Sequence, residues 1–179
     1  MKRKVTVILW AYFKLSYSLT SKKFTFKFVQ LFFHQNNIKM NDKEYKKWEK
    51  QVAEAKKSNK ELLVGFEKWL KEKSLKPNTI SNHVGNIDFY ADAFLLRYDV
   101  ILAENGALEI GMFLGDYFIR KVMWASKYTI QENIASLKKF YTFLNEIGKT
   151  SDNDLKAMKQ LIKEEKSEWL EEVESYWNN

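Results

Sequence analysis

The hydrophobic positions of residues 129–148 recur with the period of an α-helix and predict the best-defined element of the chain. The apolar residues form two adjacent stripes, made of Ile130, Ile134, Leu137, Tyr141 and Leu144 in one and Phe140, Phe143 and Ile147 in the other. An ordinary surface helix shows one stripe of about 100°, so we expect neighbours on two sides. Thr129 with Glu132 predicts a capping box, Ser126 is an alternative N-cap, and Gly148 suits a left-handed C-cap.

Three helices are predicted over residues 40–97. Residues 40–57 carry a short apolar stripe and form a leading helix, which we expect to dock loosely. Ser58 is predicted to cap a second helix that ends near Ser74. Pro77 suits the first turn of a third helix, because its missing N–H costs nothing there, and the apolar pattern carries this helix to about Arg97.

Two more helices complete the pattern. A fourth is predicted over about residues 107–124, and Ser151 can cap a last, long helix over 151–179. The acidic end of this last helix opposes the helix dipole, so we expect it to need a packing partner. With one proline and six glycines, the chain has few turn signals. The sequence predicts an all-α fold: a four- to five-helix bundle over 58–150 with helical extensions on both sides.

Residues 1–39 differ from the rest in charge. They hold eight of the 30 Lys and Arg residues and no acid, so residues 40–179 carry 22 basic against 23 acidic groups. Polyanion binding must therefore depend on local patches. The apolar run VTVILWAYF is short of the roughly 20 residues that span a bilayer. We interpret 1–39 as an atypical leader: a disordered segment or a misassigned start before Met40, with a membrane-associating or targeting leader as the rival. An intact mass matching the full chain would contradict a start at Met40.

The composition removes several kinds of chemistry. There is no cysteine, which excludes disulfides and thiol nucleophiles and fits a cytoplasmic protein. The two histidines, His34 and His83, are too few for a typical zinc site, and no glycine-rich phosphate loop is present. We interpret His83 as a partly buried hydrogen-bonding residue. We therefore expect no enzyme activity, no cofactor and no metal.

Two stretches share a pattern that points to a family. KPNTISNHV and SKYTIQENI each begin a helix with Thr-Ile, and FEKWL and FYTFL share Phe-x-x-aromatic-Leu. Over residues 58–150 this arrangement resembles the N-terminal core-binding domain of tyrosine recombinases, the phage integrase family. The resemblance implies a SAM-like orthogonal bundle that clamps one side of a DNA duplex, with the helices at Pro77–Arg97 and Ser126–Ile147 facing the DNA.

The chain departs from that family in two ways. Residues 151–179 contain no arginine or histidine, so we expect no strand cleavage. His83 stands where the family usually has a tyrosine, and no basic residue lies near Gly85 or Asn86. The predicted DNA contacts are Lys76, Asn78, Asn82, Asn86, Lys127, Gln131, Lys138 and Lys139.

Two functions remain open. The first is non-catalytic binding of double-stranded DNA by a relative of an integrase domain from a mobile element. The alternative is a helical protein–protein interaction module that kept the fold without DNA binding, with the helix around Trp169–Trp177 packing on a partner or on a second copy. Membrane association through residues 5–33 is a third, weaker interpretation.

Overall fold

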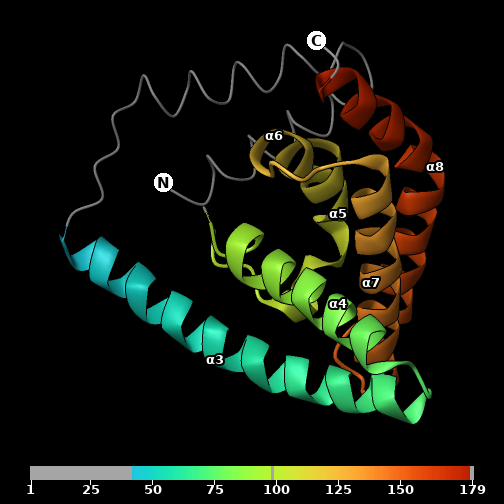
Figure 1. Ribbon diagram of the computed structural model, residues 1–179. Coiled ribbons are helices and arrows are strands. Elements are labelled where there is room, and N and C mark those ends of the chain that lie inside the picture. Colours follow the sequence, from blue (N-terminus) through green and yellow to red (C-terminus); the bar gives the residue numbers. More distant parts are fainter. Residues whose placement is uncertain (1–41, 98, 178–179) are drawn as a thin grey trace. The chain divides into compact units, whose positions relative to one another are not determined.

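The computed structural model describes residues 42–97 and 99–177 (Figure 1). The predicted leader, residues 1–39, lies outside the described residues. The chain divides into two units, Met1–Tyr45 and Lys46–Asn179, and the second contains the helices that pack on one another. Every element of the described part is a helix or a helical turn, which confirms the predicted all-α class.

The first described helix, α3 (Asp42–Glu72), corrects one prediction. It runs without a break through Ser58, where the capping pattern predicted that one helix would end and another begin. The apolar stripe continues in phase across that position, and Asn59 is buried on it. The Asn59 side-chain amide donates to Asp92 Oδ1 at 2.8 Å, so a contact distant in sequence satisfies this polar residue inside the helix.

The predicted helix from Pro77 is present as two consecutive segments. α4 spans Pro77–Asp88, and the π-helical segment η1 continues it over Phe89–Phe94. Pro77 occupies the first turn, as predicted. In the wider turns of η1 the Leu95 N–H bonds to the Tyr90 carbonyl, five residues back.

The predicted fourth helix is shorter and less regular than expected. A short 3-10 helix, η2 (Ala103–Leu108), precedes α5 (Ile110–Met112), the π-helical η3 (Phe113–Tyr117) and α6 (Phe118–Lys121), which follow one another directly. The helical run therefore begins and ends inside the predicted range.

The central helix, α7 (Lys127–Glu146), matches its prediction except at the cap. Ser126, the alternative N-cap, is the one used: its Oγ accepts from the Thr129 N–H at 3.2 Å, and its own N–H donates to Thr129 Oγ1 at 3.0 Å. Thr129 therefore serves at the third helical position, and its predicted capping box with Glu132 is wrong. Gly148 has φ +73°, which confirms the left-handed C-cap.

The last helix, α8 (Asp152–Trp177), packs through its predicted apolar side. Ser151 caps it, because its Oγ accepts from the Asp154 N–H at 3.1 Å. Trp169 is 1% exposed, so it belongs to the core of its own unit. That the helix around Trp169–Trp177 packs on a partner or a second copy stays a prediction. Glu172 forms an ion pair with Arg120 at 3.5 Å, which offsets part of the acidic charge at the helix end.

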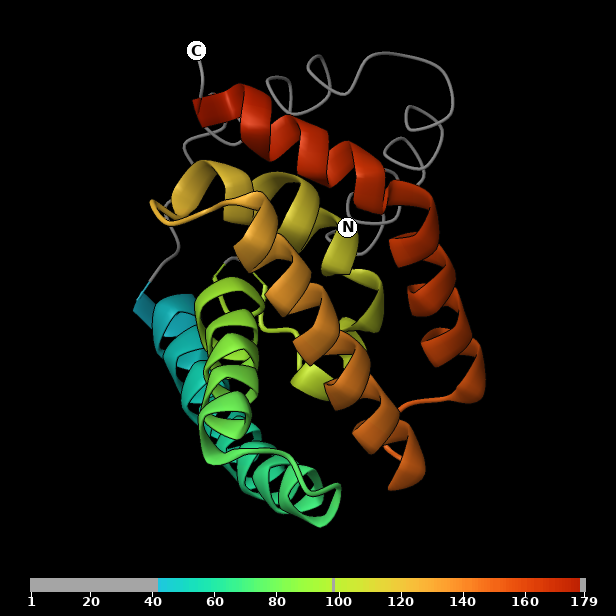
Figure 2. The same ribbon diagram turned by 45° about the vertical axis from the view of Figure 1, so that its right-hand side comes forward.

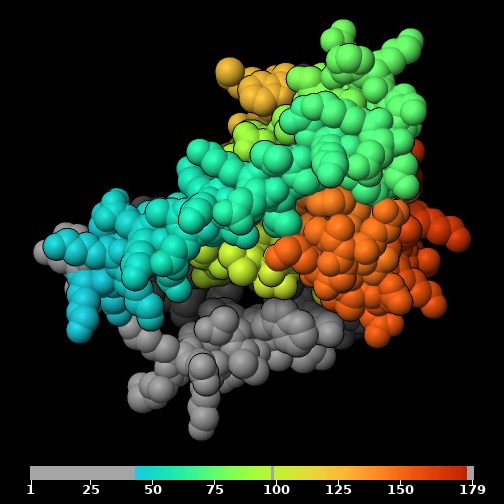
Figure 3. All heavy atoms as spheres, turned by 90° about the horizontal axis from the view of Figure 1, so that it is seen from below, coloured from blue at the N-terminus to red at the C-terminus, as the bar shows by residue number. Residues whose placement is uncertain are grey.

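The core is organised around α7, as its two apolar stripes predicted. On one side Phe66 and Trp69 of α3 contact Phe143, with ring centroids 5.8 and 6.2 Å away. α4 and α8 pack against other sides of α7 (Figure 2). In Figure 3, α3 runs in cyan and teal across this face, beside the orange residues around the end of α7.

A pair of buried tyrosines attaches the irregular middle segment to this core. The Tyr90 hydroxyl donates to the Gly106 carbonyl at 2.6 Å, and the Tyr141 hydroxyl donates to the Ala103 carbonyl at 2.9 Å. Both side chains are fully buried, and burial raises the pKa of each hydroxyl well above its ordinary value. A Cβ at Gly106 would lie 2.8 Å from the Tyr141 hydroxyl, so a larger residue there would displace the tyrosine that holds this segment. None of the helices between residues 42 and 177 combines the length and apolar character that a bilayer span requires.

Candidate functional site: the cleft between α4 and α7

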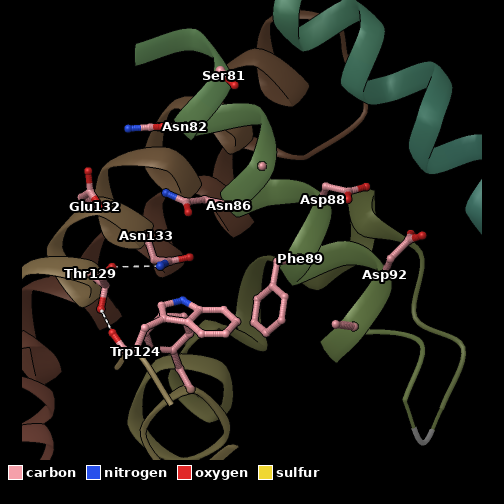
Figure 4. A pocket seen from close by; sticks show the side chains of 13 residues that line it. Ser81, Asn82, Asn86, Asp88, Phe89, Asp92, Trp124, Thr129, Glu132 and Asn133 are labelled. Atoms are coloured by element: carbon pink, nitrogen blue, oxygen red, sulfur yellow. Dashed lines mark hydrogen bonds between the residues drawn. The ribbon is translucent and has the colours of Figure 1, made fainter. Parts of the chain in front are cut away.

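A polar cleft with a volume of ≈ 610 Å³ opens between α4, η1 and the N-terminal half of α7 (Figure 4). Its lining consists of Ser81, Asn82, Gly85, Asn86, Asp88, Phe89, Asp92, Ala93, Phe118, Trp124, Thr129, Glu132 and Asn133. α4 and α7 are two helices that the resemblance placed at a DNA surface. If the predicted DNA binding used this cleft, its lining side chains would have to suit phosphate groups.

Two aromatic rings form the apolar wall of the cleft. The ring centroids of Phe89 and Trp124 lie 6.2 Å apart at an angle of 58°. Phe89 is fixed from behind by ring contacts with Phe113 and Phe118. Trp124 is 61% exposed, but its backbone is held because its carbonyl accepts the Thr129 hydroxyl at 3.1 Å. The Phe89 ring is therefore fixed by its neighbours, whereas the Trp124 ring is exposed and only its backbone is anchored.

A buried network behind the cleft joins α4 to α7. The Ser136 hydroxyl donates to the Glu132 carbonyl at 2.8 Å, so its oxygen can only accept from its other neighbours. Those neighbours are His83 Nδ1 at 2.8 Å and Asn86 Nδ2 at 3.0 Å. His83 therefore carries its proton on Nδ1. This confirms the interpretation of His83 as a buried hydrogen-bonding residue.

The pKa of His83 is lowered from its ordinary value. Burial is the main cause, and the nearby Lys139 ammonium acts in the same direction, while Glu132 opposes them. The neutral imidazole keeps its Nδ1 hydrogen for Ser136, so the network is complete without a charge on the ring. The histidine holds the two helices together and is not among the residues that line the cleft.

Asn133 is the buried polar residue of the cleft floor. It is 3% exposed, and its amide nitrogen donates to the Thr129 carbonyl at 2.8 Å. This bond fixes the orientation of the planar amide, because a carbonyl only accepts. The Asn133 carbonyl oxygen accordingly points into the hollow toward Phe89 and Trp124 (Figure 4), and no described residue donates to it.

Three carboxylates, those of Asp88, Asp92 and Glu132, lie at the edges of the cleft and point away from Asn133 (Figure 4), and no Lys, Arg or His is among the described lining residues. Asp92 is partly compensated, since Asn59 donates to its Oδ1 and Lys56 Nζ lies 3.8 Å from its Oδ2. The cleft therefore has a negative balance.

Only two of the predicted DNA contacts line the cleft. Asn82 and Asn86 line the acidic cleft, which disfavours phosphate. Lys127 is paired with Glu174 of α8 at 2.5 Å, so its charge is compensated. The remaining candidates lie outside the lining: Lys76, Asn78, Gln131 and Lys138 are exposed, and Lys139 is half-buried.

Sequence reasoning missed the residues that define the cleft. The apolar pattern predicts Trp124 only as the end of a helix over about 107–124, and it assigns no role to Asp88, Asp92 or Asn133. An asparagine among apolar residues at 130, 134 and 137 was the available signal, because a polar group on a buried face needs a partner. No group of residues with metal-ligand character occurs in the described ranges.

Comparison with protein families, curated proteins and solved structures gives no match for this chain. The resemblance to the recombinase core-binding domain therefore stays a prediction, and the function has to be argued from the cleft and the surface around it.

Proposed function

We propose that the unit Lys46–Asn179 is a non-catalytic interaction module that binds a segment of a partner protein at the cleft between α4 and α7. The observation that carries this proposal is the open cleft of ≈ 610 Å³, whose apolar wall is formed by Phe89 and the 61% exposed Trp124. A concave site that combines apolar walls with a few polar groups is the usual form of a binding site.

The surface beside the cleft supports the same function. Met123, Trp124 and Tyr128 are 84%, 61% and 70% exposed, and all three lie at the turn between α6 and α7. We name these residues the turn patch. Single exposed apolar residues are ordinary, but a group of them with aromatic rings beside a concave site is typical of binding surfaces. Trp124 belongs to both the patch and the cleft wall.

A display library of random peptides tests this proposal with the full-length chain as bait. We expect enriched peptides that bind the natural chain and lose binding to Trp124→Ala. The matched control is Val64→Ala, because Val64 is 70% exposed on α3 and does not line the cleft. Peptides that bind all three proteins equally, or no enrichment at all, would overturn the proposal.

Double-stranded DNA is a second candidate, favoured by one specific observation. Lys76, Lys138 and Lys139 form no ion pair with any described acid. Such cations are available to phosphates, which supply most non-specific DNA affinity. The exposed Asn78, on the first turn of α4, would add a polar contact.

Salt-dependent titration with duplex DNA distinguishes this candidate from the first. Residues 1–39 carry eight basic groups, which can attract DNA by themselves. The measurement is therefore the difference in DNA binding between the variant and the natural chain. If Lys76, Lys138 and Lys139 contact phosphates, the triple alanine variant lowers the slope of log K against log salt by about 0.9 for each lysine. An unchanged slope removes these residues from any DNA surface. Lys46→Ala is the single-site control, because Lys46 is exposed near the start of α3.

A further inference from the structure

A stripe of lysines runs along one face of α8. Its members are three, four and three residues apart, spacings that place side chains on the same side of a helix: Lys156, Lys159, Lys163 and Lys166. All four are exposed. At 1.5 Å per residue the stripe is about 15 Å long. A hollow of ≈ 390 Å³ lies along it, lined by Asp152, Leu155, Lys156, Lys159, Gln160 and Lys163.

The charges of this lysine stripe are uncompensated. None of its side chains forms an ion pair or a hydrogen bond with another described residue. No acid stands three or four positions from Lys159, Lys163 or Lys166. The lysines instead meet one another at these spacings, and like charges so placed destabilise a helix. An anion bound along the stripe would relieve this repulsion.

The glutamates closest to the stripe on α8 are engaged elsewhere. Glu174 forms an ion pair with Lys127 of α7. The Glu164 carboxylate accepts a hydrogen bond from Gln160 Nε2 at 2.6 Å. The positive charge of the stripe is therefore left for a partner outside the described chain.

The neighbouring edge of α7 adds one more lysine. α7 and α8 pack side by side in antiparallel directions (Figures 1 and 2). At one end Asn145 donates to Asp152 Oδ1 at 2.8 Å, and at the other end Lys127 pairs with Glu174. Lys138 is exposed and lies two turns before Asn145 and three turns after Lys127, so it shares their edge. This edge faces α8, and Asp152 also lines the hollow along the stripe.

We propose that the lysine stripe of α8, together with Lys138, binds the phosphate backbone of double-stranded DNA. Each strand of a duplex carries one phosphate about every 3.4 Å along the axis, so a stripe of about 15 Å matches about four phosphates of one strand. Contacts to phosphates carry no sequence information, so this binding is independent of sequence. The inference goes beyond the second candidate function, whose lysines include none from α8.

Two other anionic partners fit the stripe less well. A helix that lies on a membrane exposes large apolar residues beside its lysines, whereas no large apolar side chain is exposed on α8 between Lys156 and Lys166. A peptide partner is usually anchored by apolar contacts in a pocket, but Leu155, the apolar residue of the hollow, is itself buried.

Salt-dependent titration of the full-length chain with a short duplex of mixed sequence tests the inference. The triple variant Lys156→Gln/Lys159→Gln/Lys163→Gln removes three charges and keeps the side chains polar. We expect the slope of log K against log salt to fall by about 0.9 for each lysine removed. The helical circular dichroism signal reports whether the variant is folded, and Lys163→Gln alone, with an expected loss of about 0.9, replaces the triple variant if that signal is lost.

The matched control changes the net charge by the same amount on another helix. It replaces three lysines of α3 that are exposed and form no ion pair with a described residue: Lys57, Lys60 and Lys68. We expect the slope of this control to equal that of the natural chain. Polyglutamate serves as a second anion, and we expect the α8 variant to lose less affinity for it than for the duplex.

Each result decides the inference. An unchanged slope in the α8 variant would overturn it, and the Lys76, Lys138 and Lys139 variant would still decide the second candidate function. An equal loss in the α3 control would show that only net charge acts. Tight binding of polyglutamate with the same loss in the α8 variant would overturn the assignment to DNA. If the natural chain binds no duplex at low salt, the inference fails, and the display library still decides whether the cleft binds a protein segment.

Discussion

A methyl group added at Gly115 would point into the indole ring of Trp169. The Cβ of an alanine there would lie 2.8 Å from Trp169 Nε1 and 2.9 Å from Cδ1, closer than real Cβ contacts allow. Trp169 is 1% exposed and is held between α8 and η3, so the ring has little room to move. Gly115→Ala therefore tests the packing of α8 on the irregular middle segment.

Gly85 provides the matched substitution. It also lies in a helix, yet a Cβ added there meets no atom within 4 Å. Gly85→Ala should stabilise the unit by about 0.4–1 kcal/mol, because alanine restricts the unfolded chain and favours a helix. In Gly115→Ala the same gain is opposed by overpacking that costs about 1–3 kcal/mol. We expect Gly115→Ala to be the less stable variant by about 2 kcal/mol, or about 4–8 °C in melting temperature.

Urea unfolding followed by the helical circular dichroism signal measures both variants against the natural chain. A Trp169→Phe background supplies the coupling test, since the smaller ring should relieve the contact and reduce the cost of Gly115→Ala. The reasoning is refuted if Gly115→Ala is as stable as Gly85→Ala, or if its cost is the same in the Trp169→Phe background.

Two further predictions follow from the buried hydrogen bonds. Ser136→Ala removes the acceptor of both His83 Nδ1 and Asn86 Nδ2 and should cost about 1–3 kcal/mol in urea unfolding; an unchanged midpoint would contradict the network. Burial raises the pKa of Tyr90 and Tyr141 above the ordinary value of about 10, so their neutral forms are favoured in the folded state. Stability should be complete below about pH 10 and fall above it by about 1.4 kcal/mol per pH unit for each tyrosine. Tyr141→Phe should reduce that slope by about half, and equal slopes in the two proteins would show that Tyr141 ionises freely.

The basic composition of the chain is a poor guide to the surface of this unit. Lys127, a predicted DNA contact on α7, is paired with Glu174. Asn82 and Asn86 lie in a cleft whose charged lining residues are all acidic within the described ranges. A lysine is useful to a phosphate only while its charge is uncompensated. The predicted DNA contacts whose charge is uncompensated, Lys76, Lys138 and Lys139, therefore lie outside the cleft.

The sequence alone determined most of the helices. The 3.6-residue period of apolar positions is a local property, so α7, α4, α8 and the left-handed cap at Gly148 were predicted close to their observed positions. The burial of both stripes of α7 also followed from the sequence, because an apolar face that wide must be covered.

Only the tertiary structure decided the remaining features, because each depends on a partner far away in the chain. α3 passes through Ser58 since Asn59 finds Asp92, 33 residues later. Trp169 became a core residue because Gly115 leaves space for its ring. The cleft has its apolar wall because Trp124 meets Phe89, which comes from a distant part of the chain. Such pairings are set by three-dimensional distances, which the spacing of residues along a single helix does not contain.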